Sequence, residues 1–189
     1  MLNVLLMDSD CDNALLEANL GLLGFNCLRI RYGAQFLALS KDIKPDVIIF
    51  NLHTPSENLL ADLHQLNQHT PLPVVMFATD GHIDTINQAI KADISAYIVD
   101  GFAGGRLASI IYVALARFRH QQTLKTALEE ARVQLEDRKL IDRAKAILIQ
   151  TQNFTENEAY HTLRKLAMDR NITLGEMAKN VIAMAALLK

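Results

Sequence analysis

The sequence has few cysteines and no long hydrophobic run, and both shortages exclude classes of protein. Two cysteines, Cys11 and Cys27, are too few for a disulfide framework, so we expect reduced thiols. The first residues, MLNVLLMDSD, lack the basic segment and the small-residue cleavage site of a secretory signal. The apolar run Leu107–Ala116 is about half of the roughly 20 residues that cross a bilayer. We therefore expect a soluble, cytoplasmic protein.

The histidines also lack the spacing of a metal site. His53, His64, His69 and His82 form no ligand motif with the cysteines, so surface or strand-end histidines are expected instead of a zinc site. The sequence predicts no catalytic group, no metal and no cofactor.

The net charge of −2 hides two parts of opposite sign. Residues 1–110 hold six Lys/Arg and twelve Asp/Glu, a balance of −6, whereas residues 138–189 hold nine Lys/Arg and five Asp/Glu, a balance of +4. A basic segment at one end indicates an anionic partner such as a nucleic acid. At low ionic strength the acidic part could also mask the basic one.

Short runs of Val, Ile and Leu alternate with segments of helical periodicity through residues 1–118. Continuous apolar strands separated by helices are typical of a parallel sheet covered on both faces, so we predict a flavodoxin-like, doubly wound α/β domain. The predicted strands are Asn3–Met7, Cys27–Ile30, Asp46–Phe50, Pro73–Ala78 and Ala96–Val99, and the predicted helices between them lie at about residues 12–23, 34–43, 57–68 and 83–92.

Polar side chains follow the predicted strands at the edge where such folds bind ligands. Together with the order of elements and LPVVMFA before the fifth strand, they resemble the receiver domain of response regulators over about residues 1–120. The residues at this edge are Asp8 and Asp10 after the first strand, Asn51 after the third, Ala78 and Thr79 after the fourth, and Asp100 after the fifth.

The resemblance implies a phosphoryl-accepting aspartate at Asn51, a hydroxyl at Ala78 and a lysine at Asp100. An amide is not a competent nucleophile, alanine has no hydroxyl, and aspartate reverses the charge of lysine. We therefore predict a pseudo-receiver whose degenerate phosphorylation site comprises Asp8, Asp10, Asn51, Ala78 and Asp100.

The aspartates of the first loop have two interpretations. Asp8 and Asp10 would make only a weak site for a hard cation without a third oxygen ligand. A helix N-cap at Asp10 or Asp12 is favoured.

Neither glycine nor proline occurs from Leu107 to Gln150, so one long helix is predicted. Within it, Leu124, Leu128, Ala131 and Leu135 are spaced as an a/d seam flanked by charges. The first domain ends near residue 118, so we predict a coiled-coil linker helix over residues 119–137 that joins two copies as a homodimer. The alternative is packing of the seam against its own sheet.

Residues 138–189 predict a small three-helix domain. Thr155 with Glu158 and Thr173 with Glu176 have the spacing of capping boxes, each of which opens a helix with an apolar stripe.

This tail closely resembles an ANTAR domain, the RNA-binding module of transcription antiterminators, over about residues 128–188. The likeness lies in AKAIL, in EAYHTLRKLAM and in the spacing between them, with Ala146 where the family more often has glycine. Together with a degenerate receiver, the chain resembles the AmiR and NasT group of antiterminators, and SAYIVDGF followed by ALARF resembles the NasT junction.

The resemblance implies a non-catalytic, response-regulator-like protein that binds stem-loops of a leader mRNA and prevents formation of a terminator. It also implies a role in nitrate or nitrite assimilation, under a separate nitrate- or nitrite-sensing regulatory protein. We place the docking surface for that partner around Asn51, Ala78, Asp100 and Phe102.

Phosphate contacts would supply most of the RNA affinity. Tyr160 and His161 are candidates for stacking on loop bases, although core packing is the expected role of Tyr160. The predicted RNA-binding residues are Arg138, Lys139, Arg143, Lys145, Arg164, Lys165 and Arg170.

Three alternatives remain: an ordinary solvated basic face, a protein-interaction adaptor, and a DNA-binding response regulator. The last helix has only Lys179 and Lys189 as cations, which argues against a major-groove reader.

Overall fold

The computed structural model describes residues 1–8, 13–101 and 104–187. Its contacts divide the chain into two units, Met1–Gln122 and Thr123–Lys189, and each is treated by itself. The side chain of Asp8 and the residues Asp10, Cys11, Asp12, Phe102, Leu188 and Lys189, on which predictions rest, lie outside the description.

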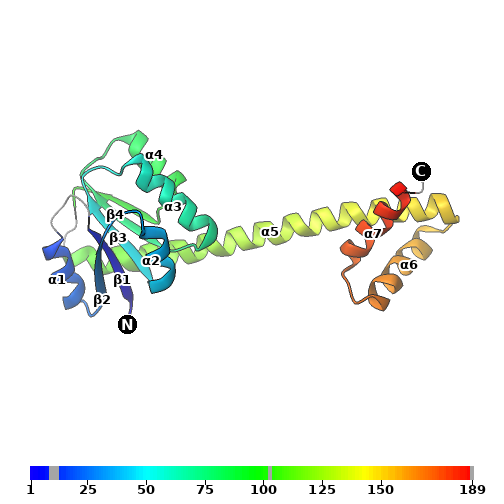
Figure 1. Cartoon of the computed structure of the whole chain (residues 1–189), viewed down its shortest axis with the longest axis horizontal. Helices are drawn as coiled ribbons and strands as arrows, with labels where there is room; N and C mark the ends of the chain where they lie inside the picture. The colour runs from blue at the N-terminus through cyan, green and yellow to red at the C-terminus, as the bar shows by residue number, and fades with distance from the viewer. Residues whose placement is uncertain (9–12, 102–103, 188–189) are drawn as a thin grey trace. The chain divides into compact units, whose positions relative to one another are not determined.

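The first unit is built on a parallel sheet with strand order β2-β1-β3-β4-β5 (Figure 1). Its strands are β1 (Asn3–Asp8), β2 (Asn26–Arg31), β3 (Val47–Leu52), β4 (Val74–Ala78) and β5 (Ala96–Val99). Its helices are α1 (Ala14–Leu22), α2 (Phe36–Ile43), α3 (Glu57–His69), α4 (Ile83–Lys91) and the first part of α5 (Leu107–Gln152), which the 3-10 turn Gly104–Arg106 precedes.

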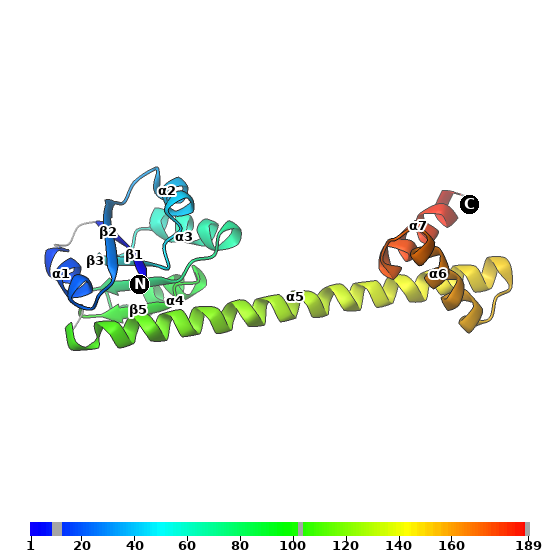
Figure 2. The ribbon, with the colours of Figure 1, turned by 90° about the horizontal axis from the view of Figure 1, so that it is seen from below.

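Side chains alternate along each central strand between two cores. In β1, Val4 and Leu6 pack with α1 and the first turns of α5, whereas Leu5 and Met7 pack with α2, α3 and α4. Figure 2 shows α5 passing along the sheet on the side away from α2 and α3. The predicted doubly wound α/β fold is confirmed.

One detail of the sheet differs from the predicted set of continuous apolar strands covered on both faces. Strand β2 lies at the edge of the sheet and is largely exposed, with Leu28 at 46% exposure, because only β1 pairs with it. Helix α1 takes Asn13 as its N-cap residue, and the predicted cap at Asp10 or Asp12 falls on residues outside the description.

The second unit packs α6 (Glu156–Asp169) and α7 (Leu174–Leu187) against the last turns of α5. Its buried core comprises Ala144, Leu163, Ala167, Met177 and Ala178. The three small residues in this set let the helix backbones approach closely. The predicted three-helix bundle is present.

Both predicted capping boxes are present. Thr155 N donates to Glu158 Oε2 at 2.8 Å, and Glu158 N donates back to Thr155 Oγ1 at 3.3 Å. Thr173 and Glu176 repeat the exchange at 2.9 and 3.2 Å. The backbone hydrogen bonds hold the pKa of each glutamate below its usual value. Each glutamate therefore stabilises the start of its helix both by its hydrogen bonds and by its negative charge.

No helix within the described ranges has both the length and the apolar character that crossing a membrane requires.

Helix α7 approaches α5 closely at Gly175. This glycine is buried in the first turn of α7, and a Cβ atom added there would overlap the carboxylate of Asp137. The close packing of the two helices at this point therefore depends on residue 175 having no side chain.

We expect Gly175→Ala to destabilise the wild-type protein but to stabilise an Asp137→Ala variant. Alanine is favoured over glycine in a helix, by no more than about 1 kcal/mol at this first-turn position, but this gain is available only once the carboxylate is gone. Denaturant unfolding of the four proteins of this cycle should give a coupling of roughly 0.5–3 kcal/mol. Additive effects of the two substitutions would contradict the packing argument.

Candidate nucleic-acid interface

The cations predicted on α5 differ in whether they already form an ion pair with a carboxylate. Lys139 and Arg143 lie four residues apart and so share one side of the helix. The Lys139 ammonium is 2.9 Å from Glu136 Oε1, whereas Arg138 and Arg143 are exposed and make no ion pair within the described residues. Arg143 also borders an apolar hollow of about 670 Å³ between the end of α5 and α7, lined in part by Ile147 and Met184.

Lys145 is held inside the bundle by two carboxylates. Its ammonium lies 2.8 Å from Asp142 Oδ1 on α5 and 2.9 Å from Glu156 Oε1 in the first turn of α6, and its side chain is 16% exposed. Hydrogen bonds to both carboxylates raise the pKa of Lys145. This three-residue clamp ties α6 to α5 and leaves the ammonium little surface for a phosphate.

The cations of α6 are more accessible. Arg164 and Lys165 are exposed, and Arg170 is exposed at the C-cap of the helix. Of the salt bridges formed among the described residues, none involves these three side chains. They can therefore bind an anionic ligand without first breaking an ion pair.

Tyr160 is not a core residue, so the expectation of core packing is wrong. Its side chain is 39% exposed on α6, and its ring meets that of His161 edge to face with centroids 6.0 Å apart.

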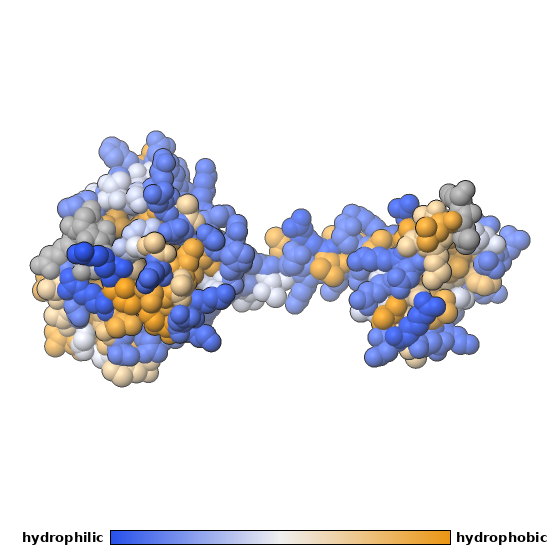
Figure 3. Space-filling model, viewed as in Figure 1, coloured by the Kyte–Doolittle hydropathy of each residue, from blue (hydrophilic) through white to orange (hydrophobic). Residues whose placement is uncertain are grey.

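The predicted dimerisation seam lies on the surface of α5. Leu124, Leu128 and Leu135 are 56%, 63% and 59% exposed, and Ala131 is exposed between them. Figure 3 shows hydrophobic side chains reaching the surface along the middle of this helix. The seam is therefore exposed within the described part of the second unit.

The degenerate phosphorylation site is assembled at the carboxyl edge of the sheet. Asn51 lies in β3 opposite Phe77, and Ala78, which is buried, ends β4. The backbone N–H of Asp100, just after β5, donates to the carbonyl of Ala78 at 3.0 Å. The backbone of Asp8 ends β1 beside β3. The described positions Asn51, Ala78 and Asp100 are thus neighbours, with an amide and a methyl group at the first two where the resemblance implies a carboxylate and a hydroxyl.

The hydroxyl of Thr79 does not replace the missing one. It donates to the carbonyl oxygen of His53 at 3.2 Å, and the same oxygen accepts the backbone N–H groups of Thr79 and Asp80 at 3.1 and 3.0 Å. The Tyr97 hydroxyl donates to the carbonyl of Asp80 at 2.7 Å. Strand β5 and the end of β3 therefore both hold the loop after β4.

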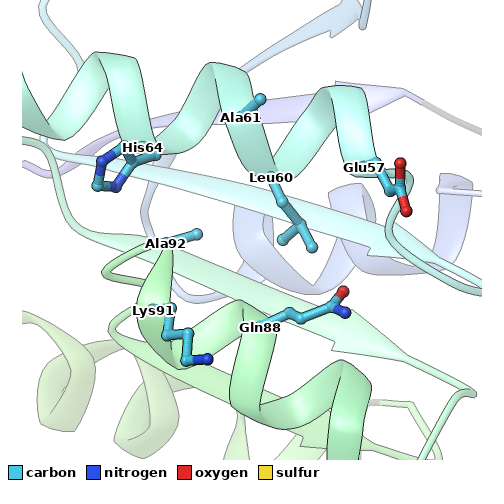
Figure 4. A pocket seen from close by; sticks show the side chains of 7 residues that line it. All are labelled: Glu57, Leu60, Ala61, His64, Gln88, Lys91 and Ala92. Atoms are coloured by element: carbon cyan, nitrogen blue, oxygen red, sulfur yellow. The ribbon is translucent and has the colours of Figure 1, made fainter.

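An open hollow of about 440 Å³ lies between α3 and α4 of the same unit. Figure 4 shows Leu60 projecting from α3 towards α4, with Glu57 near Gln88 at one end and His64 near Lys91 at the other. The hollow has an apolar floor and opposite charges at its two ends, and none of the predicted RNA-binding residues lines it.

Sequence reasoning missed the partners of Lys145 and the role of Gly175. The spacing of Asp142 and Lys145, three residues apart, was a usable signal because such pairs meet on a helix. No sequence signal pointed to Glu156, because its contact with Lys145 exists only once α6 folds back onto α5.

Comparison with known proteins identifies the second unit. Residues 129–182 match the ANTAR domain. The transcriptional regulatory protein PdtaR of Mycobacterium tuberculosis is 28% identical over 150 residues, which cover 79% of this chain and 73% of that protein. The nitrate regulatory protein of Klebsiella oxytoca is 39% identical over 66 residues, which cover 35% of this chain and 17% of that protein. The predicted ANTAR domain is confirmed, and these relatives are regulatory proteins.

A solved structure shows the same fold in the first unit. The signal receiver domain of a modulated diguanylate cyclase from Desulfovibrio desulfuricans G20 matches with a TM-score of 0.55 at 18% identity. The match covers 64% of this chain and 98% of that domain. The receiver-like fold is confirmed.

We expect Lys145→Met to lower the thermal unfolding midpoint of the protein modestly, because it removes the Lys145–Glu156 ion pair that joins α6 to α5 and leaves two carboxylates near each other. Lys139→Met is the matched control, since its ion pair is exposed on both sides and should contribute almost nothing. Circular dichroism at 222 nm measures both. Equal midpoints for the two variants would show that the clamp has no structural role.

Acid should weaken the same clamp. The hydrogen bond from Lys145 holds the pKa of Asp142 below its ordinary value. A carboxylate with a lowered folded pKa stabilises above its unfolded pKa of about 4, and this contribution is lost as the pH falls through the folded pKa. The difference in midpoint between wild type and Lys145→Met should therefore shrink below about pH 4.

Proposed function

We propose that this chain, in which an ANTAR domain follows a receiver-like domain, binds stem-loops of a leader mRNA and prevents a terminator hairpin from forming. One observation carries the proposal: the ANTAR match over residues 129–182 falls on helices whose exposed cations include several without an ion pair within the described residues. The relative PdtaR, matched over most of this chain, is a transcriptional regulatory protein.

RNA binding would rest on the cations of α5 and α6. Arg138, Arg143, Arg164, Lys165 and Arg170 would contact phosphates directly, because none of them must first break an ion pair. Lys139 would exchange Glu136 for a phosphate at little cost, since its ion pair is exposed. Among the predicted RNA-binding residues, Lys145 serves the surface indirectly by holding α6 in place.

A homodimer would present two such surfaces. The exposed seam Leu124, Leu128, Ala131 and Leu135 would be covered by the same seam of a second copy, which removes apolar surface from water. Two ANTAR domains held together could engage two hairpins of one transcript, and binding of the second hairpin would then be intramolecular and correspondingly stronger.

Control would come from a partner protein instead of phosphorylation. Asn51 offers no carboxylate to a phosphoryl group, so the receiver-like unit would act as a docking surface around Asn51, Ala78 and Asp100. The name of the Klebsiella oxytoca relative favours nitrate or nitrite as the signal, sensed by a separate regulatory protein.

The test is binding of the purified protein to a two-hairpin leader RNA and to duplex DNA of equal length across a salt series. We expect tight, loop-dependent RNA binding that Arg164→Ala/Lys165→Ala weakens, with a decrease in the salt slope of about 1 for each phosphate-binding cation that is removed. Lys41→Ala, an exposed cation on α2, is the matched control and should change nothing.

Lys145 is left intact in this test because its substitution would disturb the fold. Weak binding to both nucleic acids that Arg164→Ala/Lys165→Ala does not alter would rule out the RNA function. Preference for the duplex DNA would support a DNA-binding response regulator instead.

We expect Leu128→Glu to shift the protein from dimer to monomer in sedimentation experiments, because a charge would enter the seam. Val133→Glu is the control: Val133 is 52% exposed but lies off the seam, on the side of α5 that continues towards the bundle core. Dimers that survive Leu128→Glu would exclude this seam as the interface.

A further inference from the structure

The apolar hollow of about 670 Å³ between the last turns of α5 and the end of α7 has the size of a ligand site. Its floor continues the bundle core, because Leu148, Val181 and Ile182 line the hollow and also pack against the core. These three side chains are only half-buried, so part of their apolar surface remains open. Small-molecule sites usually have volumes of about 300–1,000 Å³ and mostly apolar walls.

One cation stands at the rim of this hollow. Arg143 is exposed, and it is the only charged side chain among the described residues that line the hollow. It makes no ion pair with any residue that the structure describes. An apolar cleft with a single unpaired cation is complementary to a ligand that has an apolar body and one negative charge.

The hollow is elongated along α5. Arg143 and Gln152, which both line it, are nine residues apart, or about 13 Å along the helix axis. Near the second of these residues, the Thr151 hydroxyl donates to the carbonyl of Ile147 at 2.8 Å and is therefore engaged within α5. A chain-like ligand could thus place its charged group at Arg143 and its apolar part along the remaining length.

We propose that this hollow binds a small amphipathic monocarboxylate, that is, an alkanoate with a chain of medium length. The planar guanidinium of Arg143 would donate two parallel hydrogen bonds to the carboxylate. The alkyl chain would lie on Ile147, Val181 and Ala185 and remove their open apolar surface from water. The proposal does not depend on RNA binding, so the two can fail separately.

Other small or charged ligands fit the lining less well. A nucleic acid would find one cation and a largely apolar wall, whereas a polyanion gains its affinity from several cations. An amphipathic cation would meet Arg143 and, among the described lining residues, no carboxylate. The single positive charge therefore favours a monoanion.

The experiment titrates the full chain with decanoate, below its micelle concentration, in protein labelled with ¹³C at the methionine methyl groups. Met184 lines the hollow and is 49% exposed, and Met184→Leu assigns its signal. We expect this signal to shift in a saturable manner, with one decanoate bound per chain. Met168, which is 70% exposed on α6 and does not line the hollow, is the internal reference and should not shift.

Chain length and head group separate apolar burial from recognition of charge. From hexanoate to decanoate, affinity should rise by up to about fourfold for each added CH₂ group that is buried. Arg143→Gln should weaken decanoate binding about fivefold but should leave binding of the neutral decanol unchanged. Arg138→Gln, which removes an exposed cation of α5 outside the hollow, is the matched control and should bind decanoate as wild type.

Three results would overturn the proposal. A Met184 signal that does not respond to any of the alkanoates would show that the hollow does not bind them. Equal decanoate affinities of wild type and Arg143→Gln would exclude a carboxylate site at this arginine. A Met184 signal that shifts on dilution of the protein, without ligand, would assign the hollow to a second copy of the chain.

Discussion

The structure depends on the unbroken hydrogen-bonding of α5, a 46-residue helix that contributes side chains to both cores. Leu107, Ile111 and Ala114 complete the core beneath the sheet, and Ala144 lies at the centre of the ANTAR bundle. Within the second unit, the helical period of 3.6 residues places Ala144 in the bundle core and leaves Leu128 and Leu135 exposed on the opposite side of the helix.

The two units use polar side chains differently. In the receiver-like unit the two cores are formed by apolar side chains, and Asn51 and Asp100 belong to neither core. The fold of this unit therefore does not depend on the side chains at those two positions. In the ANTAR unit the polar residues are instead part of the architecture: Glu156, Glu158 and Glu176 each stabilise a helix start or a helix contact.

Local signals made most of the fold predictable. Continuous Val and Ile runs gave the central strands, and the two threonine–glutamate boxes gave the starts of α6 and α7 to within a residue. Strand β2 was also predicted, at Cys27–Ile30, but its place at the edge of the sheet depends on the pairing of strands far apart in the sequence. For the candidate site, the cationic side chains could be predicted from the sequence, but not which of them already form ion pairs. The ion pair from Lys145 to Glu156 and the exposure of Tyr160 both depend on how α6 packs, which no local pattern contains.

The carbonyl of His53 accepts three hydrogen bonds from Thr79 and Asp80, and the Tyr97 hydroxyl donates to the carbonyl of Asp80, so the loop after β4 is held at two points. A loop restrained in this way has little conformational entropy left to lose. A protein that docks on this edge of the sheet would therefore meet a surface already in its bound shape, and more of the interaction energy would appear as affinity. Such an edge would suit a partner whose presence, and not a covalent modification, carries the signal.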